Sequence, residues 1–475
     1  MSLLLLSAAL LAPPCSEAGV GDAVLAVRVS RPFARPAGLF GAAGEEMLAE
    51  QSGVLLARPG GEPALLTTFR AAAFAPTAAE SVGADRLPGD VRAVVRLPDG
   101  RSTPIAVLAA DPHSGLAAFV PVEPGAFSDL PTARLAEGAG PELGETICIL
   151  HRSENGSNAA VPRAVAGFGR SYPAAAAGGG RDWVGDDPGP GVLHAFGTLA
   201  DLDPPPPPGA SGGGAFDADG ALVGLLIEPE AGDALPPRML PLTGEFRRVV
   251  EALLAGEAVG YGLLGVEPAS VTADAAAAVL PGEAAAGAAS LEDVRGNSPA
   301  ERAGLRRGDW IVGFTDESGV STPVSSAADL VRLTALTPPG ATVTLEAIVP
   351  RTGVRRSVAV ALVAAATGRA AGGWPAVATE PRGLPVRGLR VDWPTAAALT
   401  PPGEPLPTGA LIVAADALPV ADANPLGRRV VRVGDRIEAV NGQPIASPAE
   451  FAARVAETPG PVAVRLSDGT AATLP

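Results

Sequence analysis

The chain has 475 residues, of which 47% are hydrophobic and 4% aromatic. A chain of this length exceeds what one hydrophobic core fills, and it predicts about three domains. The formal net charge is −16 and no basic stretch runs along the sequence, which argues against a nucleic-acid partner held through its phosphates. Two cysteines and three widely spaced histidines form no cluster, so we expect no metal site, no cofactor and no disulfide framework.

Residues 1–18 have features of a signal peptide. An apolar run over residues 3–12 is too short to span a bilayer as a helix. Ser16 and Ala18 place small residues at the spacing that a signal peptidase prefers, so we expect cleavage after Ala18, which removes Cys15. This predicts a secreted or periplasmic protein. No basic segment precedes the apolar run, so a membrane anchor or an uncleaved start stays open.

Residues 22–248 are predicted to form a mainly β domain, because short apolar runs alternate with glycine and proline turns. The expected strands are Ala23–Val29, Ser52–Ala57, Ala64–Thr68, Val91–Leu97, Thr146–Leu150 and Ala221–Ile227. After this domain, Phe246–Ala255 has the apolar spacing of a helix and is followed by a glycine.

A glycine-rich turn, Gly209-Ala210-Ser211-Gly212-Gly213, precedes the last of these strands. It presents one hydroxyl between residues without side chains. The backbone N–H groups of Gly209 and Ser211 can then point at one spot, as an oxyanion hole requires. The alternative is a surface turn that happens to contain a serine.

This turn resembles the nucleophile loop of trypsin-like serine proteases of the HtrA type, which reads Gly-Asn-Ser-Gly-Gly. The resemblance implies a double β-barrel with a Ser–His–Asp triad. The family's histidine motif matches residues 65–72, where Arg70 takes the histidine position. Its aspartate motif, Asp-Pro-x-x-Asp-Leu-Ala, matches residues 111–117, where Gly115 takes the aspartate position. Ser211 alone remains of the triad.

The two replacements predict an inactive protease domain. Arginine stays protonated and has no lone pair with which to accept the proton of Ser211, and Gly115 has no side chain to orient a base. Loss of the base costs a serine protease a factor on the order of 10⁶ in turnover. The alternative is an active endopeptidase in which His113, His151 or His194 replaces the base. For Arg70, pairing with a carboxylate and binding of an anionic ligand both stay open.

The C-terminal half contains an internal repeat. Residues 298–309 align without gaps to residues 424–435, and both copies end in Gly-Asp before a predicted strand, 310–314 or 436–440. Each continues to a helix with an expected serine cap, Ser326 or Ser447, and closes with a β run, 342–348 or 461–466.

This order of elements resembles the PDZ domain of HtrA proteins. The resemblance divides the chain into a protease-like domain (22–248), a first PDZ domain (256–363), a linker (364–385) and a second PDZ domain (386–475). It implies binding of peptides or unfolded protein segments, with C-terminal peptides captured in the first PDZ domain by the loop Leu263-Leu264-Gly265-Val266. In the second, we align Arg390 to the position where glycine is expected, which predicts weak capture.

The chain is therefore predicted to be an HtrA-like scaffold, chaperone or regulator. A structural envelope protein, in which both repeats act as spacers, is the third alternative. Trimers are common in the family, and a homotrimer stays open.

Overall fold

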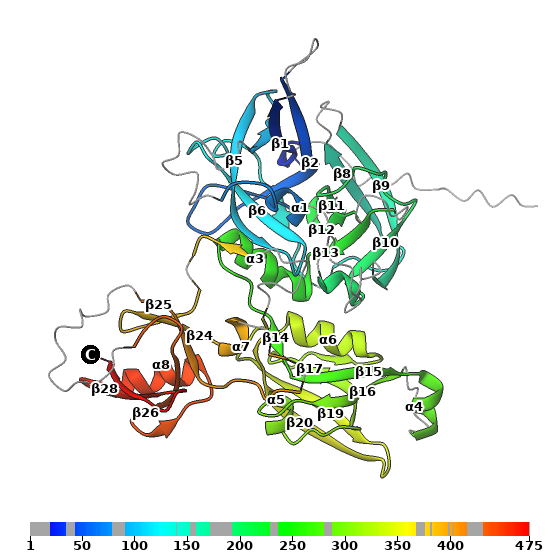
Figure 1. Ribbon diagram of the computed structural model, residues 1–475. Helices are drawn as coiled ribbons and strands as arrows, with labels where there is room; N and C mark the ends of the chain where they lie inside the picture. The colour runs from blue at the N-terminus through cyan, green and yellow to red at the C-terminus, as the bar shows by residue number, and fades with distance from the viewer. Residues whose placement is uncertain are drawn as a thin grey trace, which may run out of the picture. The chain divides into compact units, whose positions relative to one another are not determined.

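The computed structural model describes residues 20–34, 43–77, 91–138, 140–152, 158–171, 192–228, 236–279, 287–366, 376–380, 382–397, 400–401, 403–415 and 431–474. The predicted signal peptide and residues 424–430 of the second repeat lie outside this part. The chain divides into two units, residues 1–259 with 374–380 and residues 260–373 with 381–475 (Figure 1). No helix within the described ranges is long and apolar enough to cross a bilayer.

The first unit begins with a closed six-stranded barrel (Figure 1). Its strands pair in the order β5-β4-β1-β2-β3-β6, and β6 returns to β5. The strands are β1 (Val24–Ala34), β2 (Ala43–Leu56), β3 (Ala64–Thr68), β4 (Arg92–Arg96), β5 (Ser102–Asp111) and β6 (Leu116–Pro121). A short strand from far along the chain, β22 (Val377–Ala378), adds to β5.

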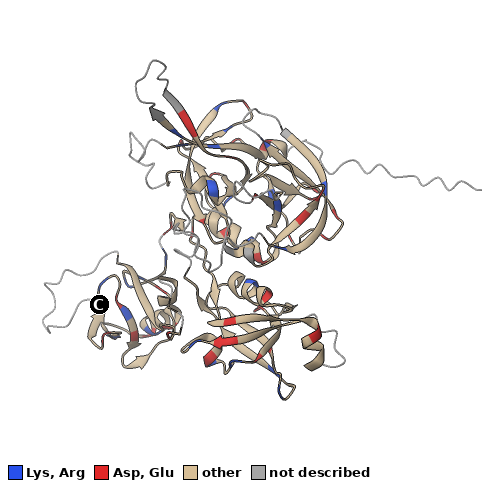
Figure 2. Ribbon diagram, turned by 45° about the vertical axis from the view of Figure 1, so that its right-hand side comes forward, with Lys and Arg blue, Asp and Glu red and all other residues tan. Residues whose placement is uncertain are grey.

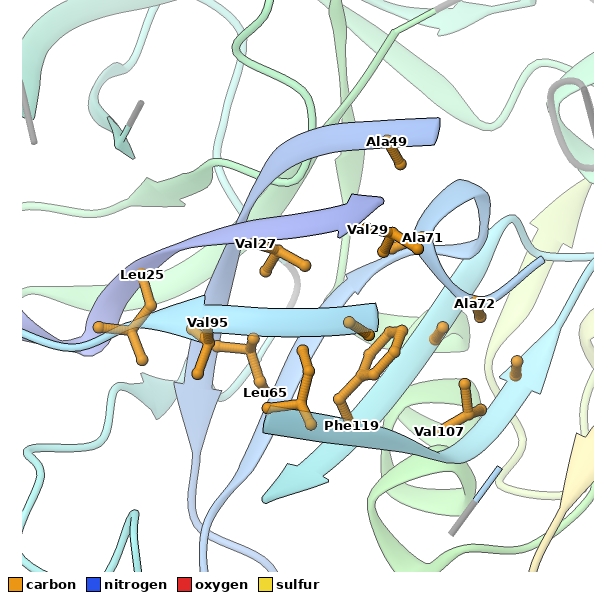
Figure 3. Packing of buried hydrophobic residues seen from close by; sticks show 14 of the residues in the cluster. Leu25, Val27, Val29, Ala49, Leu65, Ala71, Ala72, Val95, Val107 and Phe119 are labelled. Carbon is orange, nitrogen blue, oxygen red and sulfur yellow. The ribbon is translucent and has the colours of Figure 1, made fainter. Parts of the chain in front are cut away.

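The core of this barrel is made of inward-facing aliphatic side chains around Phe119, which is fully buried (Figure 3). Leu25 and Val27 from β1 and Leu65 from β3 pack in the same cluster. The helix α1 (Phe69–Ala72) adds Ala71 and other residues to it, so α1 is fixed against the barrel. This packing matters for the site because α1 carries Arg70.

The second barrel also closes with six strands, in the order β11-β8-β9-β10-β13-β12 with β12 pairing back to β11. They are β8 (Thr146–Arg152), β9 (Asn158–Arg170), β10 (Leu199–Asp203), β11 (Gly214–Phe216), β12 (Ala221–Ile227) and β13 (Arg238–Pro241), with β7 (Arg134–Leu135) beside β12. The predicted fold class, a mainly β double barrel, is confirmed.

The helix α3 (Arg247–Ala255) follows the second barrel and packs on β5 and β6 of the first. It ends at Gly256, whose φ of +79° is the left-handed conformation that glycine adopts at a helix end. The prediction of this helix is confirmed, and it ends at the predicted residue.

The second unit contains the two repeats. The first repeat consists of β14 (Gly262–Leu263), β15 (Val266–Val271), α4 (Ala273–Val279), β16 (Ala288–Val294), α5 (Pro299–Arg302), β17 (Trp310–Thr315), β18 (Ser321–Pro323), α6 (Ala327–Leu336), β19 (Thr342–Val349), β20 (Val354–Ala361) and β21 (Val363–Ala364). The second consists of β23 (Leu384–Val386), β24 (Leu389–Asp392), α7 (Pro394–Ala397), β25 (Ala410–Ala415), β26 (Arg436–Val440), β27 (Gln443–Pro444), α8 (Pro448–Glu457), β28 (Val462–Leu466) and β29 (Ala471–Leu474).

The two repeats have matching sheets, β15-β16-β17-β19-β20 and β24-β25-β26-β28-β29. The Gly-Asp pairs that the sequence singled out make the same backbone contacts: Gly308 donates to Leu291 O at 2.7 Å and Gly434 to Ile412 O at 2.8 Å. Ser326 and Ser447 cap α6 and α8, each accepting a hydrogen bond from the backbone three residues on. The predicted internal repeat and both caps are confirmed.

One expectation about cysteine is wrong. Cys148, on β8, is disulfide-bonded, although the sequence led us to expect no disulfide. The sequence holds one other cysteine, Cys15, which lies outside the described residues.

Candidate functional site

Arg70 and Gly115 lie side by side although they are far apart in the sequence. Arg70 is the second residue of α1, which follows directly after the fully buried strand β3. The N–H group of its neighbour Phe69 donates to Gly115 O at 2.8 Å. The sequence motifs therefore identified two positions that the fold brings together.

Gly115 lies in the tight turn between β5 and β6. The turn is closed by Asp111, whose buried carboxylate accepts hydrogen bonds from the N–H groups of Ser114 at 2.9 Å and His113 at 3.3 Å. Gly115 has a φ of +70°, a conformation that glycine adopts without steric cost. Nothing at this position can hold an imidazole by a side-chain hydrogen bond.

The loop of Ser211 is fixed against the first barrel by its backbone. Ser52 N on β2 donates to Ser211 O at 2.8 Å, and Gly212 N donates to Leu226 O on β12 at 2.8 Å. A Cβ atom at Gly212 would lie 1.9 Å from Ser52 O, so only glycine fits there. Ser211 itself is 9% exposed.

A short chain of contacts connects this loop to Arg70. Thr67 Oγ1 donates to Ser52 O at 2.6 Å, and Gln51 Nε2 donates to Thr67 Oγ1 at 2.7 Å. Thr67 and Thr68 end β3, and α1 with Arg70 begins at the next residue. Ser211, Arg70 and Gly115 are thus positioned by β2, β3 and α1, where the two barrels meet.

The predicted oxyanion-hole donor Gly209 has another partner. Its N–H group donates to Glu228 Oε1 at 3.1 Å. Gly209 has a φ of +82° and ample space around it, so the turn tolerates this orientation. A carboxylate at this N–H competes with an oxyanion for the same donor and opposes negative charge there. Glu228 could not be found from the sequence, because its contact depends on where the end of β12 meets the loop.

Two of the histidines lie on the Gly115 side of the site. Leu193 N donates to His113 O at 3.0 Å, and His194 follows on the same short 3₁₀ helix, Val192–Ala195. His194 is fully buried and its Nδ1 lies 3.1 Å from Thr198 Oγ1. Burial, reinforced by the neighbouring His113, lowers the pKa of His194 to about 3, so its ring is neutral at physiological pH.

The third histidine, His151, lies next to the serine loop. A Cβ atom at Gly213 would be 2.9 Å from His151 Cβ, which places the two residues in contact. The ring is half-buried, and burial followed by the charge of Arg163 lowers its pKa. Its Nε2 atom is buried without a hydrogen-bond partner among the described residues. The sequence named His151 only as one of three candidate bases and could not place it beside the serine loop, because His151 and Ser211 are 60 residues apart.

The loop Leu263–Val266 in the first repeat leads into β15. Leu264 is buried, and its carbonyl accepts from Ala300 N at 3.1 Å, while Gly265 O accepts from Arg295 N at 3.0 Å. Gly265 has a φ of +78°, and a Cβ atom there would lie 2.4 Å from Ser298 Cβ. β15 is the outer strand of its sheet, and α6 packs beside it.

In the second repeat, our sequence alignment of Arg390 with the loop glycine is wrong. Val266 pairs with Val294 at the start of β15, and Leu389 takes the corresponding place opposite Ala415 at the start of β24. Gly388, directly before Leu389, has the same φ of +78° as Gly265. The loop glycine is therefore present, and Arg390 belongs to the strand.

Comparison with known proteins agrees with the fold of the first unit. Residues 51–225 match the family model of the trypsin-like peptidase domain. This unit has the trypsin-like serine protease fold. No curated protein matches the chain.

Solved structures of proteases are similar at low identity. The HtrA-type protease AlgW with a decapeptide is 20% identical, with a TM-score of 0.47, over 73% of this chain and 96% of that one. A serine endoprotease from Yersinia pestis is 16% identical, with a TM-score of 0.41, over 73% and 95%.

Figure 2 shows arginines and acidic residues spread over both units of the chain. The described residues contain no group of three or more His, Cys, Asp or Glu side chains that could hold a metal ion.

Proposed function

We propose that this protein is a catalytically inactive, trypsin-fold protein of the HtrA type that binds peptides or unfolded segments in the periplasm or outside the cell. The inactivity is inferred from Arg70 and Gly115, which are held close together because the N–H group of Phe69, the neighbour of Arg70, donates to Gly115 O. In the motif alignment, Arg70 and Gly115 take the positions of the proton acceptor and of its orienting carboxylate, and neither residue type can do that chemistry. The contact between Glu228 and the Gly209 N–H also opposes catalysis, because it occupies a donor that an oxyanion hole would need.

The test is reaction of Ser211 with a fluorophosphonate probe and cleavage of casein. We expect no labelling and no cleavage. The matched control is Ser211→Ala, which should be indistinguishable from the unmodified chain. Labelling that disappears in Ser211→Ala would refute the proposal.

A relocated base is the second candidate, and the contact between His151 and Gly213 is the observation that favours it. His151→Ala separates the two candidates, because it removes any labelling that depends on His151 and changes nothing in an inactive domain. The double variant Arg70→His with Gly115→Asp tests the reason for inactivity. It should gain labelling at Ser211, and more so when Glu228→Ala removes the acceptor of the Gly209 N–H.

Peptide binding is assigned to the outer edge of β15, between this strand and α6. These two repeats are proposed to be PDZ domains, which bind an extended peptide as an additional strand. The edge strand supplies backbone groups, and the buried Leu264 with the partly buried Val266 gives an apolar floor at the loop. An extended peptide that ends in an apolar residue fits this arrangement.

Fluorescence anisotropy with a labelled peptide library tests this assignment. Gly265→Ala should abolish binding, since its Cβ atom would meet Ser298 Cβ at 2.4 Å and distort the loop. Gly319→Ala is the matched control: Gly319 has a φ of +86° in the same repeat, but nothing lies within 4 Å of an added Cβ. Equal loss of binding in both variants would contradict the assignment.

A further inference from the structure

The outer edge of the second repeat is already covered by a strand. In the first repeat, β15 is the last strand of its sheet, whereas in the second repeat β23 pairs antiparallel with β24 outside it. The pairs are Leu384 with Val391, Pro385 with Arg390 and Val386 with Leu389. Since β25 takes the other side of β24, β23 lies on the edge that corresponds to the free edge of β15.

The helix of the second repeat packs on this added strand. α6 packs against β15 in the first repeat, and the equivalent helix α8 packs against β23. Val386 is only 7% exposed and belongs to the apolar cluster that contains Phe451 and Val455 of α8. The strand β23 therefore lies between β24 and α8, and its last residue fills an apolar pocket beside the loop glycine Gly388.

The turn after β23 explains how the chain doubles back. Arg387 and Gly388 have φ values of +47° and +78°, so both central residues are left-handed, as a two-residue type I′ hairpin turn requires. In the first repeat, only Gly265 of the corresponding pair has a positive φ. The chain before β15 consequently leaves the edge, and β14 pairs with β21 instead.

Arg387 fastens this turn to the end of α8. Its guanidinium donates to the carbonyl oxygens of Val455 at 3.2 Å, Thr458 at 2.5 Å and Gly460 at 2.5 Å. These carbonyls lie at or just beyond the C-terminal end of α8 (Pro448–Glu457), where backbone acceptors lack helical partners and a positive charge is favoured. The left-handed φ of Arg387, unfavourable for a residue with a Cβ atom, is offset by these bonds.

We propose that Leu384–Val386 is a built-in strand ligand that closes a peptide-binding edge in the second repeat, with Arg387 as its latch. The site under it takes an extended peptide that ends in an apolar residue such as valine. This inference rests on the proposed strand addition at β15 for the chemistry, but its observations belong to the second repeat alone. A short tether gives the built-in strand a high effective concentration, so an external peptide binds only after release of the strand.

The experiment uses the full chain carrying Gly265→Ala, which removes binding by the first repeat. The probe is a fluorescein-labelled peptide with a free carboxylate and the sequence of residues 381–386, Pro-Arg-Gly-Leu-Pro-Val. Arg387→Ala in this background should raise its affinity about tenfold or more by removing the competing strand. Arg454→Ala is the control, because it removes an arginine from α8 whose side chain donates to Gln443 on β27.

Hydrogen exchange read by mass spectrometry reports whether β23 has left. We expect slow exchange over residues 384–392 in the parent and faster exchange after Arg387→Ala. Fast exchange in the parent, or release of β23 without a gain in peptide binding, overturns the proposal.

If Arg387→Ala keeps slow exchange, its role as latch is refuted, and Val386→Asp then tests the strand by placing a carboxylate in the apolar pocket. Release in Val386→Asp without peptide binding overturns the built-in ligand as well. Failure of peptide binding by the chain with intact Gly265 would instead refute the function assigned to β15, so the two failures are distinguishable.

Discussion

The first and second repeats differ at one edge while sharing the rest of their architecture. Both have the same strand order, the same Gly-Asp contact and a serine-capped helix beside the sheet. In the first repeat the outer strand β15 is free to pair, and in the second β24 is covered by β23. The difference starts at one backbone angle, since Arg387 has a positive φ and Leu264 does not. Similar sequences can therefore give one sheet that ends at β15 and one in which the corresponding strand is covered by β23.

The largest expected effect is on stability, when the aromatic ring packed in the same cluster as β23 is removed. Phe451→Ala deletes a fully buried ring of the cluster that holds Val386 and should cost about 3–5 kcal/mol of unfolding free energy. Leu333→Ala on α6 is the counterpart in the first repeat and should cost about 2–5 kcal/mol. Urea unfolding followed by hydrogen exchange measures both.

The region in which each variant loses hydrogen-exchange protection tests the comparison between the two repeats. Phe451→Ala should accelerate exchange over residues 384–392, and Leu333→Ala should leave these residues unchanged. Unaltered protection of 384–392 in Phe451→Ala would show that β23 does not depend on this cluster.

Acid should destabilise the first unit and leave the stability of the repeats unchanged. All three histidines lie in the first unit, and the pKa of His194 falls from an ordinary 6.5 to about 3 on folding. Below pH 6.5 the unfolded chain takes up a proton that folded His194 refuses, so stability present above pH 6.5 is lost as the pH falls. Between pH 6.5 and 4.5 this loss is about 2–3 kcal/mol for one group.

The repeats should keep their stability over this interval. Asp329 in the first repeat stays ionised there: burial raises its pKa, but the hydrogen bonds from Ser325 and Ser326 outweigh burial and lower the pKa overall. Exchange at several pH values, corrected for the intrinsic rate, reports each unit separately. His194→Asn should flatten the pH dependence of the first unit by nearly one proton. A pH dependence that persists unchanged in His194→Asn would assign it to other groups.

The smallest effect is expected where the repeats are most alike. Ser326→Ala and Ser447→Ala each remove a helix cap, with Oγ accepting from Asp329 N at 3.2 Å and Glu450 N at 3.1 Å. Each should cost about 1 kcal/mol in its own repeat. Urea midpoints that differ strongly between the two variants would mean that the covering strand β23 also supports α8.

Features that depend on a few neighbouring residues could be read from the sequence. The serine caps, the Gly-Asp turns and the strands Ala64–Thr68 and Ala221–Ile227 were predicted and are confirmed, because each is set by local hydrogen bonds or by a continuous apolar run. The positions of Arg70 and Gly115 also came from local motifs.

Tertiary structure decided everything that depends on pairing between distant segments. It placed Gly388 instead of Arg390 in the loop, put β23 on the edge of β24, and turned the Gly209 N–H to Glu228. It also contradicted the expected absence of a disulfide at Cys148. A two-residue change of register, such as that between Arg390 and Gly388, keeps the same side chains on each face of a strand, so the sequence carries little information about it. The register is selected only when α8, the sheet and the Arg387 contacts are assembled together.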